Sequence, residues 1–378
     1  FRLIQFNLRK IDAGEVDAKR LVAQVIEHGA NGVLINAGGI LPRSPGHGGN
    51  DHSNGDVMAL VVRECHRQGL KLVVCLDVSR ADADLYDRHP DWFQLSAEGV
   101  VKRHGDMLLT CFQGPYWREY SFLLVDEIMS HYPVDGFFHG HLWYGHCTCR
   151  RCREAFRENT GMELPWYEDL SEPSWRAYIR FRYQEMANYA GRLHSFIRSR
   201  NPRAIFTASF SPIGDAEQHP RQPGGLGVPK GMGQAVDVVT SQAFNGLDRA
   251  LPRYYLWPGQ DARMGRAIGE DRAVCVIVTY SETSACPRAA QPPAQLAYDL
   301  MQIAAHGAQP CVQLPGTFDQ DDRKALPTIK AVYHYLRDHA ASYENLVSNA
   351  RVALVYSQTT VDFYGRGDLA EYRGFYEA

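Results

Sequence analysis

Short apolar runs alternate along the chain with stretches in which apolar residues recur every three to four positions. The short runs have the length and β-branched content of buried strands, and the longer stretches have the periodicity of amphipathic helices. Strands and helices in strict alternation are typical of parallel βα units, and eight such units in series predict a closed (β/α)8 barrel. The predicted strands cover residues 3–8, 32–36, 70–77, 136–142, 204–210, 236–244, 273–280 and 310–314.

The helix ends carry recognisable signals. A helix over 17–28 ends at Gly29 and one over 56–68 ends at Gly69, where glycine suits a left-handed terminating residue. A third helix over 172–200 stops before Pro202, because proline cannot extend a helix. This third helix is longer than a barrel requires.

Three connections that follow predicted strands are long, namely 41–55, 81–115 and 212–233. In a (β/α)8 barrel such connections surround the active site at the carboxyl ends of the strands. They predict a deep site on that face, although a simply mobile loop is the alternative for 212–233.

A further apolar strand is predicted over 351–356, after the last barrel helix at 325–339. The predicted organisation is a barrel over 1–345, followed over 346–378 by the beginning of a second α/β domain. An extension that packs on the barrel is the alternative.

Composition and charge narrow the class of protein. The chain has 378 residues, of which 45% are hydrophobic and 22% charged, as in an ordinary globular enzyme. Forty Lys and Arg against 43 Asp and Glu predict neither nucleic acid nor a membrane surface as partner. No apolar run approaches the roughly 20 residues that span a bilayer. The odd number of cysteines, nine, favours a reducing compartment, so we expect a cytoplasmic protein.

Cys147, Cys149 and Cys152 stand close enough to be three ligands of one metal ion. Cys111 is the best candidate for a fourth ligand, and His146 is the alternative. Thiolates favour zinc, and four protein ligands leave no open position, so the sequence predicts a structural zinc site. Ordinary thiols without a metal are the other possibility. Most of the remaining cysteines are expected in the core: Cys65, Cys75, Cys275 and Cys311.

Polar residues follow the predicted strands, where they would converge on the mouth of the barrel. Amides and aromatic rings dominate this set and suit the hydroxyl groups and apolar faces of a small carbohydrate. The candidate residues are Asn7, Asn36, Asp77, Arg80, His139, His141, Trp143, Ser209, Gln242, Tyr280, Glu282 and Gln313. No glycine-rich phosphate cradle is present, and no organic cofactor is expected. Metal ligation by His139 and His141 is a weaker alternative to hydrogen bonding.

Several segments resemble a group of known enzymes. CFQGPYWREY, YPVDGFF, CTCRRCREAF and TGMELP are similar to segments of glycoside hydrolase-like barrels related to the trimeric microbial beta-galactosidases and to a group of alpha-L-fucosidases. The likeness implies a structural zinc on Cys111, Cys147, Cys149 and Cys152. ARVALVYSQ resembles the start of their flavodoxin-like trimerisation domain, which implies a homo-oligomer, a trimer if that domain is present.

The resemblance also implies catalytic residues. The beta-galactosidase nucleophile matches Glu282 in VTYSET, whereas His139 stands where the relatives place a carboxylate. Asp77 is the best second carboxylate, with an ion pair to Arg80 as the alternative, and His139 could act as general acid. The leading hypothesis is a hydrolase of a small galactoside or fucoside. The alternatives are a sugar-binding barrel without chemistry, and a lyase or epimerase that uses His139 or Tyr280 as base.

Overall fold

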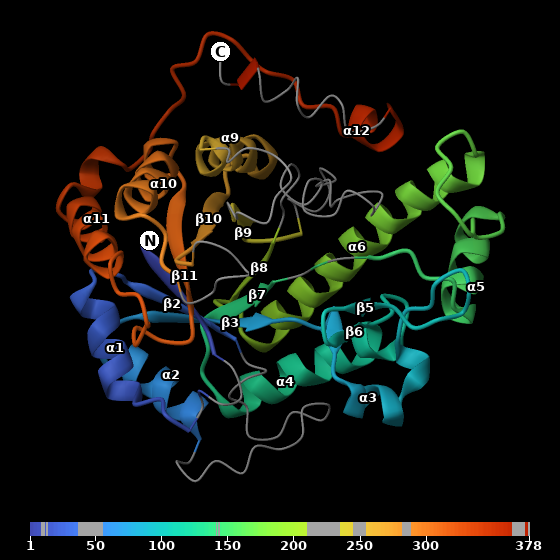
Figure 1. Ribbon diagram of the computed structural model, residues 1–378, viewed down its shortest axis with the longest axis horizontal. Helices are drawn as coiled ribbons and strands as arrows, with labels where there is room; N and C mark the ends of the chain where they lie inside the picture. Colours follow the sequence, from blue (N-terminus) through green and yellow to red (C-terminus); the bar gives the residue numbers. More distant parts are fainter. Residues whose placement is uncertain are drawn as a thin grey trace.

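Eight parallel strands close into a barrel in the computed structural model, which confirms the predicted (β/α)8 architecture (Figure 1). The structure describes residues 1–8, 12, 14–36, 56–140, 142, 144–209, 235–244, 255–281, 289–364 and 375–376. Around the ring the order is β1-β11-β10-β9-β8-β7-β3-β2. The strands are β1 (Leu3–Asn7), β2 (Gly32–Asn36), β3 (Lys71–Leu76), β7 (Gly136–His139), β8 (Ile205–Ser209), β9 (Val238–Gln242), β10 (Ala273–Thr279) and β11 (Gln309–Pro315).

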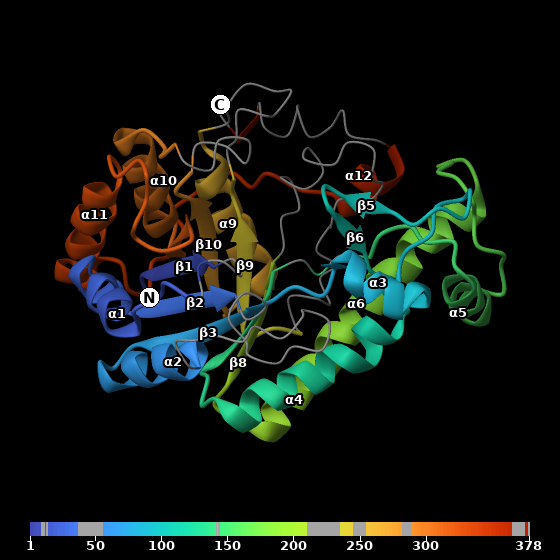
Figure 2. The same ribbon diagram turned by 60° about the horizontal axis from the view of Figure 1, so that its bottom comes forward.

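Helices cover the outside of this ring (Figures 1 and 2). The covering helices are α1 (Ala18–Glu27), α2 (Val57–Arg67), α4 (Ser121–His131), α6 (Pro173–Arg200), α9 (Trp257–Gly269), α10 (Pro293–Ala305) and α11 (Leu326–Asp338). Asp17 and Asp56 accept hydrogen bonds from the first backbone N–H groups of α1 and α2. Gly29 and Gly69 follow these helices with positive φ angles of 77° and 74°, as the sequence predicts.

The long connection after β3 folds into a small unit of its own. It contains α3 (Ala83–Arg88), the short helix η2 (Pro90–Trp92) and an antiparallel sheet of β4 (Arg80–Ala81), β6 (Met107–Leu109) and β5 (Arg103–His104). A π-helical turn, η3 (Tyr116–Tyr120), then leads into α4. Figure 2 shows this unit beside α6, together with α5 (Arg150–Thr160).

Successive side chains of each strand point to opposite faces, and this alternation produces two separate hydrophobic cores. Side chains such as Leu34, Val73, Phe138 and Ile277 come from strands all around the ring and fill its interior. Their neighbours in sequence point outward into a larger core between the strands and the helices. Cys65 and Cys311 are fully buried, Cys275 is buried and Cys75 is partly buried, so these thiols lie in the cores as expected.

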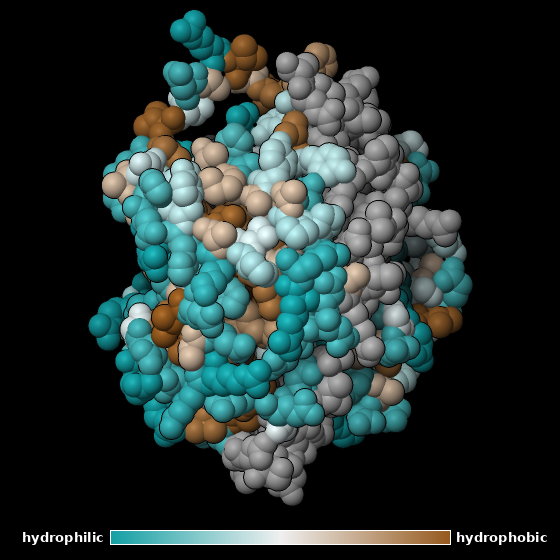
Figure 3. All heavy atoms as spheres, turned by 60° about the vertical axis from the view of Figure 1, so that its left-hand side comes forward, coloured by the Kyte–Doolittle hydropathy of each residue, from teal (hydrophilic) through white to brown (hydrophobic). Residues whose placement is uncertain are grey.

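The predicted strand over 351–356 is wrong. The structure has irregular chain there, and Val352 and Val355 are 86% and 82% exposed. A strand needs a neighbour for its backbone hydrogen bonds, and none of the described strands pairs with this segment. In Figure 3, hydrophobic atoms lie on the segment that projects above the body. The chain then returns to the barrel through α12 (Gln358–Tyr364), where the Tyr183 hydroxyl donates to Asp362 over 2.7 Å.

No helix in the described part of the chain has both the length and the apolar character that a membrane span needs.

We predict that Gly136→Ala destabilises the barrel by about 2–3 kcal/mol, because overpacking at a rigid site is costly. A Cβ at Gly136 would collide with the Ile205 carbonyl oxygen and lie 2.5 Å from its Cγ1. Gly191→Ala is the matched control, since a Cβ there meets nothing within 4 Å and lies inside α6. The control should gain about 0.5–1 kcal/mol. Chemical denaturation measures both, and equal effects would contradict the close contact between β7 and β8.

Candidate functional site

The barrel interior becomes polar at the carboxyl ends of its strands. Every second side chain of each strand points into the barrel, and four polar residues stand at such inward positions. They are Asn7, Asn36 and Gln242 at the ends of β1, β2 and β9, and Asp77 directly after β3. Since parallel strands present their carboxyl ends at one mouth, these four residues lie around the same opening of the barrel.

Asp77 is held by two neighbours. Its Oδ1 accepts hydrogen bonds from the Ser79 backbone N–H at 2.9 Å and from the Ser79 hydroxyl at 2.5 Å. Its Oδ2 accepts from Arg80 Nε at 3.1 Å, so the ion pair considered from the sequence is present. The side chain keeps 26% exposure. Three donors therefore hold both oxygens of this carboxyl group in place.

The mouth amides join the ends of different strands. Asn36 accepts from the Leu8 backbone N–H at 2.7 Å and donates to the Leu8 carbonyl at 2.5 Å. Gln242 donates to the Gly140 carbonyl at 3.0 Å and to the Ser209 hydroxyl at 2.9 Å. These bonds brace the rim of the barrel, so both amides have a structural task beside any contact with a ligand.

His139 and Tyr280 do not reach the mouth, contrary to expectation. The fully buried His139 ring stacks on Trp117 with centroids 5.2 Å apart and meets Tyr189 edge-on at 5.9 Å. The Tyr280 hydroxyl donates to the Asp322 carbonyl over 2.7 Å, and burial raises the pKa of Tyr280 to about 12. Each follows an inward position in its strand, so each points outward into the helix layer.

Three other candidates, Glu282, His141 and Trp143, lie outside the described residues, as do the connections over 37–55 and 210–234. The structure therefore leaves their predicted roles as predictions.

The four cysteines come together, as predicted. Cys111 precedes η3, and the other three lie after β7 and at the start of α5. All four Sγ atoms lie within 4.8 Å of one another and are buried, so the cluster can hold a metal ion. His146 is not part of it, because its Nε2 donates to the Pro165 carbonyl over 2.8 Å.

The thiols compete for protons. Hydrogen bonds to neighbouring thiols raise the pKa of Cys111 and Cys152 and lower the pKa of Cys147 and Cys149. Without a cation, four negative sulfur atoms at this spacing repel one another strongly. A metal ion would allow all four to ionise.

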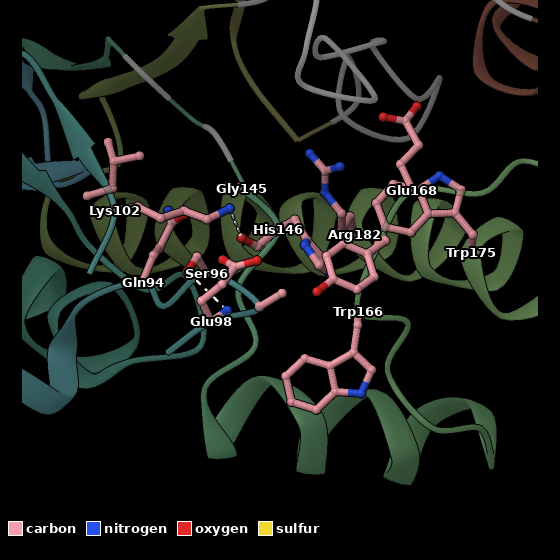
Figure 4. Close-up of a pocket in the computed structure, with 13 residues that line it drawn as sticks. Gln94, Ser96, Glu98, Lys102, Gly145, His146, Trp166, Glu168, Trp175 and Arg182 are labelled. Carbon is pink, nitrogen blue, oxygen red and sulfur yellow. Dashed lines mark hydrogen bonds between the residues drawn. The ribbon is translucent and has the colours of Figure 1, made fainter. Parts of the chain in front are cut away.

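A pocket of about 280 Å³ lies outside the ring of strands, between the unit after β3 and the first half of α6 (Figure 4). Its wall toward the small unit contains Gln94, Ser96, Glu98 and Lys102, and its other wall contains residues after β7 and on α6. Lys102 Nζ donates to the His146 carbonyl over 2.6 Å and ties the two walls together. The surplus length of the helix that carries Trp175 and Arg182 is the one feature of the sequence that relates to this pocket.

Comparison with known proteins agrees with this architecture. Residues 17–140 match a family model described as hypothetical glycosyl hydrolase 6. A beta-galactosidase of Thermus thermophilus is 30% identical over 128 residues, which are 32% of this chain and 20% of that protein. The chain thus spans about one fifth of the length of this curated relative.

Solved structures extend the likeness to the whole fold. The alpha-L-fucosidase isoenzyme 2 of Paenibacillus thiaminolyticus has a TM-score of 0.72 at 18% identity, over 98% of this chain and 56% of its own. A beta-galactosidase of Bacillus circulans sp. alkalophilus has a TM-score of 0.74 at 13% identity, over 100% of this chain and 62% of its own. Residues 17–140 therefore carry the sequence pattern of a glycosyl hydrolase family, within a barrel whose fold beta-galactosidases and an alpha-L-fucosidase share.

Proposed function

We propose that the protein is a glycoside hydrolase that acts on a small galactoside or fucoside at the mouth of its barrel. The observation that carries this proposal is the polar mouth with an anchored Asp77, in a chain whose residues 17–140 match a glycosyl hydrolase family. The substrate class follows the names of its relatives, beta-galactosidases and an alpha-L-fucosidase.

The order of the strands around the barrel supports a carboxylate on each side of the substrate. Three strands separate β3 from β10 in either direction, so Asp77 and Glu282 follow opposite strands. We assign Glu282 as nucleophile. Asp77, held in place by Ser79 and Arg80, would bind sugar hydroxyls and stabilise the positive charge that develops on the ring.

Of the two alternative functions, the structure weakens one. A lyase or epimerase that uses His139 or Tyr280 loses support, because both side chains are buried and point away from the mouth. The other alternative, a sugar-binding barrel without catalytic activity, is tested by the hydrolysis assay described next.

The purified protein should hydrolyse at least one nitrophenyl glycoside among those of galactose, fucose, glucose, arabinose and xylose. Glu282→Gln and Asp77→Asn should each lower kcat by about 100-fold or more, since each removes a group that acts in the transition state. Asp87→Asn, on the exposed side of α3, is the control and should keep full activity.

Full activity of Glu282→Gln would contradict the assigned nucleophile. If no glycoside is turned over but one of these sugars raises the melting temperature, the protein is a binder.

We further propose that the cysteine cluster holds a structural zinc ion. Zinc–thiolate bonds of about 2.3 Å in a tetrahedron place the sulfurs about 3.8 Å apart. The Sγ atoms of Cys152, Cys149 and Cys147 lie 3.4, 3.6 and 3.8 Å from that of Cys111. Four protein ligands leave no position for water, so the ion would fasten the segment around Cys111 to the loop after β7.

Metal analysis should find one zinc per chain, and Cys149→Ser should lower that content. Removal of the ion by a chelator should lower the melting temperature by about 5 °C or more, because metal binding contributes folding free energy. Cys65→Ser, in a buried thiol of α2 outside the cluster, is the control and should keep its zinc. A metal-free protein that a chelator does not affect would contradict this role.

The full-length protein is proposed to be a cytoplasmic homo-oligomer, and a trimer if a flavodoxin-like domain follows residue 346. This oligomer rests on the resemblance alone. Light scattering on the full-length protein should give three times the mass of one chain, and a monomeric mass would contradict it.

A further inference from the structure

We propose that the pocket between the unit after β3 and α6 binds one ring of a neutral sugar, separately from the mouth of the barrel. This inference does not depend on hydrolysis at the mouth. Figure 4 shows Lys102 on one side of the pocket and Arg182 and Trp175 on the other, with His146 between them.

Two buried polar groups that line the pocket have no protein partner among the described residues. Trp175 and Gln94 are each 1% exposed, and neither the Trp175 indole N–H nor the Gln94 Oε1 has a hydrogen-bond partner. The Gln94 Nε2 is occupied, since it donates to the Thr110 carbonyl over 2.9 Å. Leaving a buried donor and a buried acceptor unmet is costly, and hydroxyl groups of a ligand can satisfy both.

The other polar groups of the pocket favour hydroxyls over an anion. His146 donates from Nε2 to Pro165, so its Nδ1 is an acceptor, while Lys102 has ammonium hydrogens beyond the one given to His146. Carboxylates of Glu98 and Glu168 accompany the cations of Lys102 and Arg182 in the lining. A phosphate would leave the acceptors unmet, whereas each sugar hydroxyl both donates and accepts.

An aromatic side chain completes the match. Tyr167 lines the pocket and is 69% exposed, so its ring can cover the apolar face of a sugar. Trp166 does not serve this purpose, because its indole turns toward α5 (Figure 4) and Arg153 lies 5.8 Å over its ring. A volume of about 280 Å³ is near the lower limit of ligand pockets and suits one ring of an oligosaccharide.

Binding by NMR saturation transfer and titration tests this site, with lactose, 2′-fucosyllactose, cellobiose, maltose and xylobiose as probes. Glu282→Gln is the common background, so that no probe is hydrolysed during the measurement. At least one probe should bind, and Trp175→Phe and Tyr167→Ala should each weaken its binding about tenfold, the effect of one lost hydrogen bond or ring contact. Tyr298→Ala, on a tyrosine of α10 that is 46% exposed, is the matched control and should bind as the background does.

Hydrolysis is measured separately with Glu282 intact. The two pocket substitutions should leave kcat/KM for nitrophenyl monoglycosides within twofold of the parent. If no probe binds, or if the pocket substitutions leave all binding unchanged, the sugar site is overturned while hydrolysis at the mouth can still be present. Loss of binding in Tyr167→Ala together with a lowered melting temperature would also count against the site, since this exposed ring should not support the fold.

Discussion

The two-residue repeat of a strand is the constraint on which this molecule depends. In a closed barrel, an inward side chain faces either the packed interior or the mouth, and the next side chain faces the helices. Phe138 fills the interior, and His139 therefore packs on Trp117 outside the ring. The same rule directs Asn7, Asn36, Asp77 and Gln242 inward, so one phase along each strand decides which polar groups a substrate can meet.

The sequence was sufficient for features that local patterns determine. Apolar runs located all eight strands, and Gly29 and Gly69 marked the ends of α1 and α2 because a left-handed residue is needed there. The cysteine cluster was predictable because three ligands lie within six residues and the fourth falls in the neighbouring βα unit.

Features that depend on direction or on distant partners were not predictable in the same way. Position at the end of a strand indicated His139 and Tyr280, but only the phase of the strand shows that they point outward. The apolar segment over 351–356 has the composition of a strand and has no strand beside it among the described residues. Gln94 and Trp175 belong to no motif, and only the folding of the unit after β3 against α6 brings them to one pocket.

One stretch of backbone, at Gln94 and Leu95, borders both the cysteine cluster and the pocket. Leu95 donates its backbone N–H to Cys147 Sγ over 3.4 Å, and the Thr148 backbone N–H donates to the Leu95 carbonyl over 3.1 Å. The chain that presents sulfur to a metal on one side thus presents Gln94 to the pocket on the other. Thermodynamic linkage then requires reciprocity: if a metal ion at the thiols tightens sugar binding, the sugar tightens metal binding by the same factor. Under that condition, a metal ion with no open coordination position would influence carbohydrate binding through the backbone of Leu95.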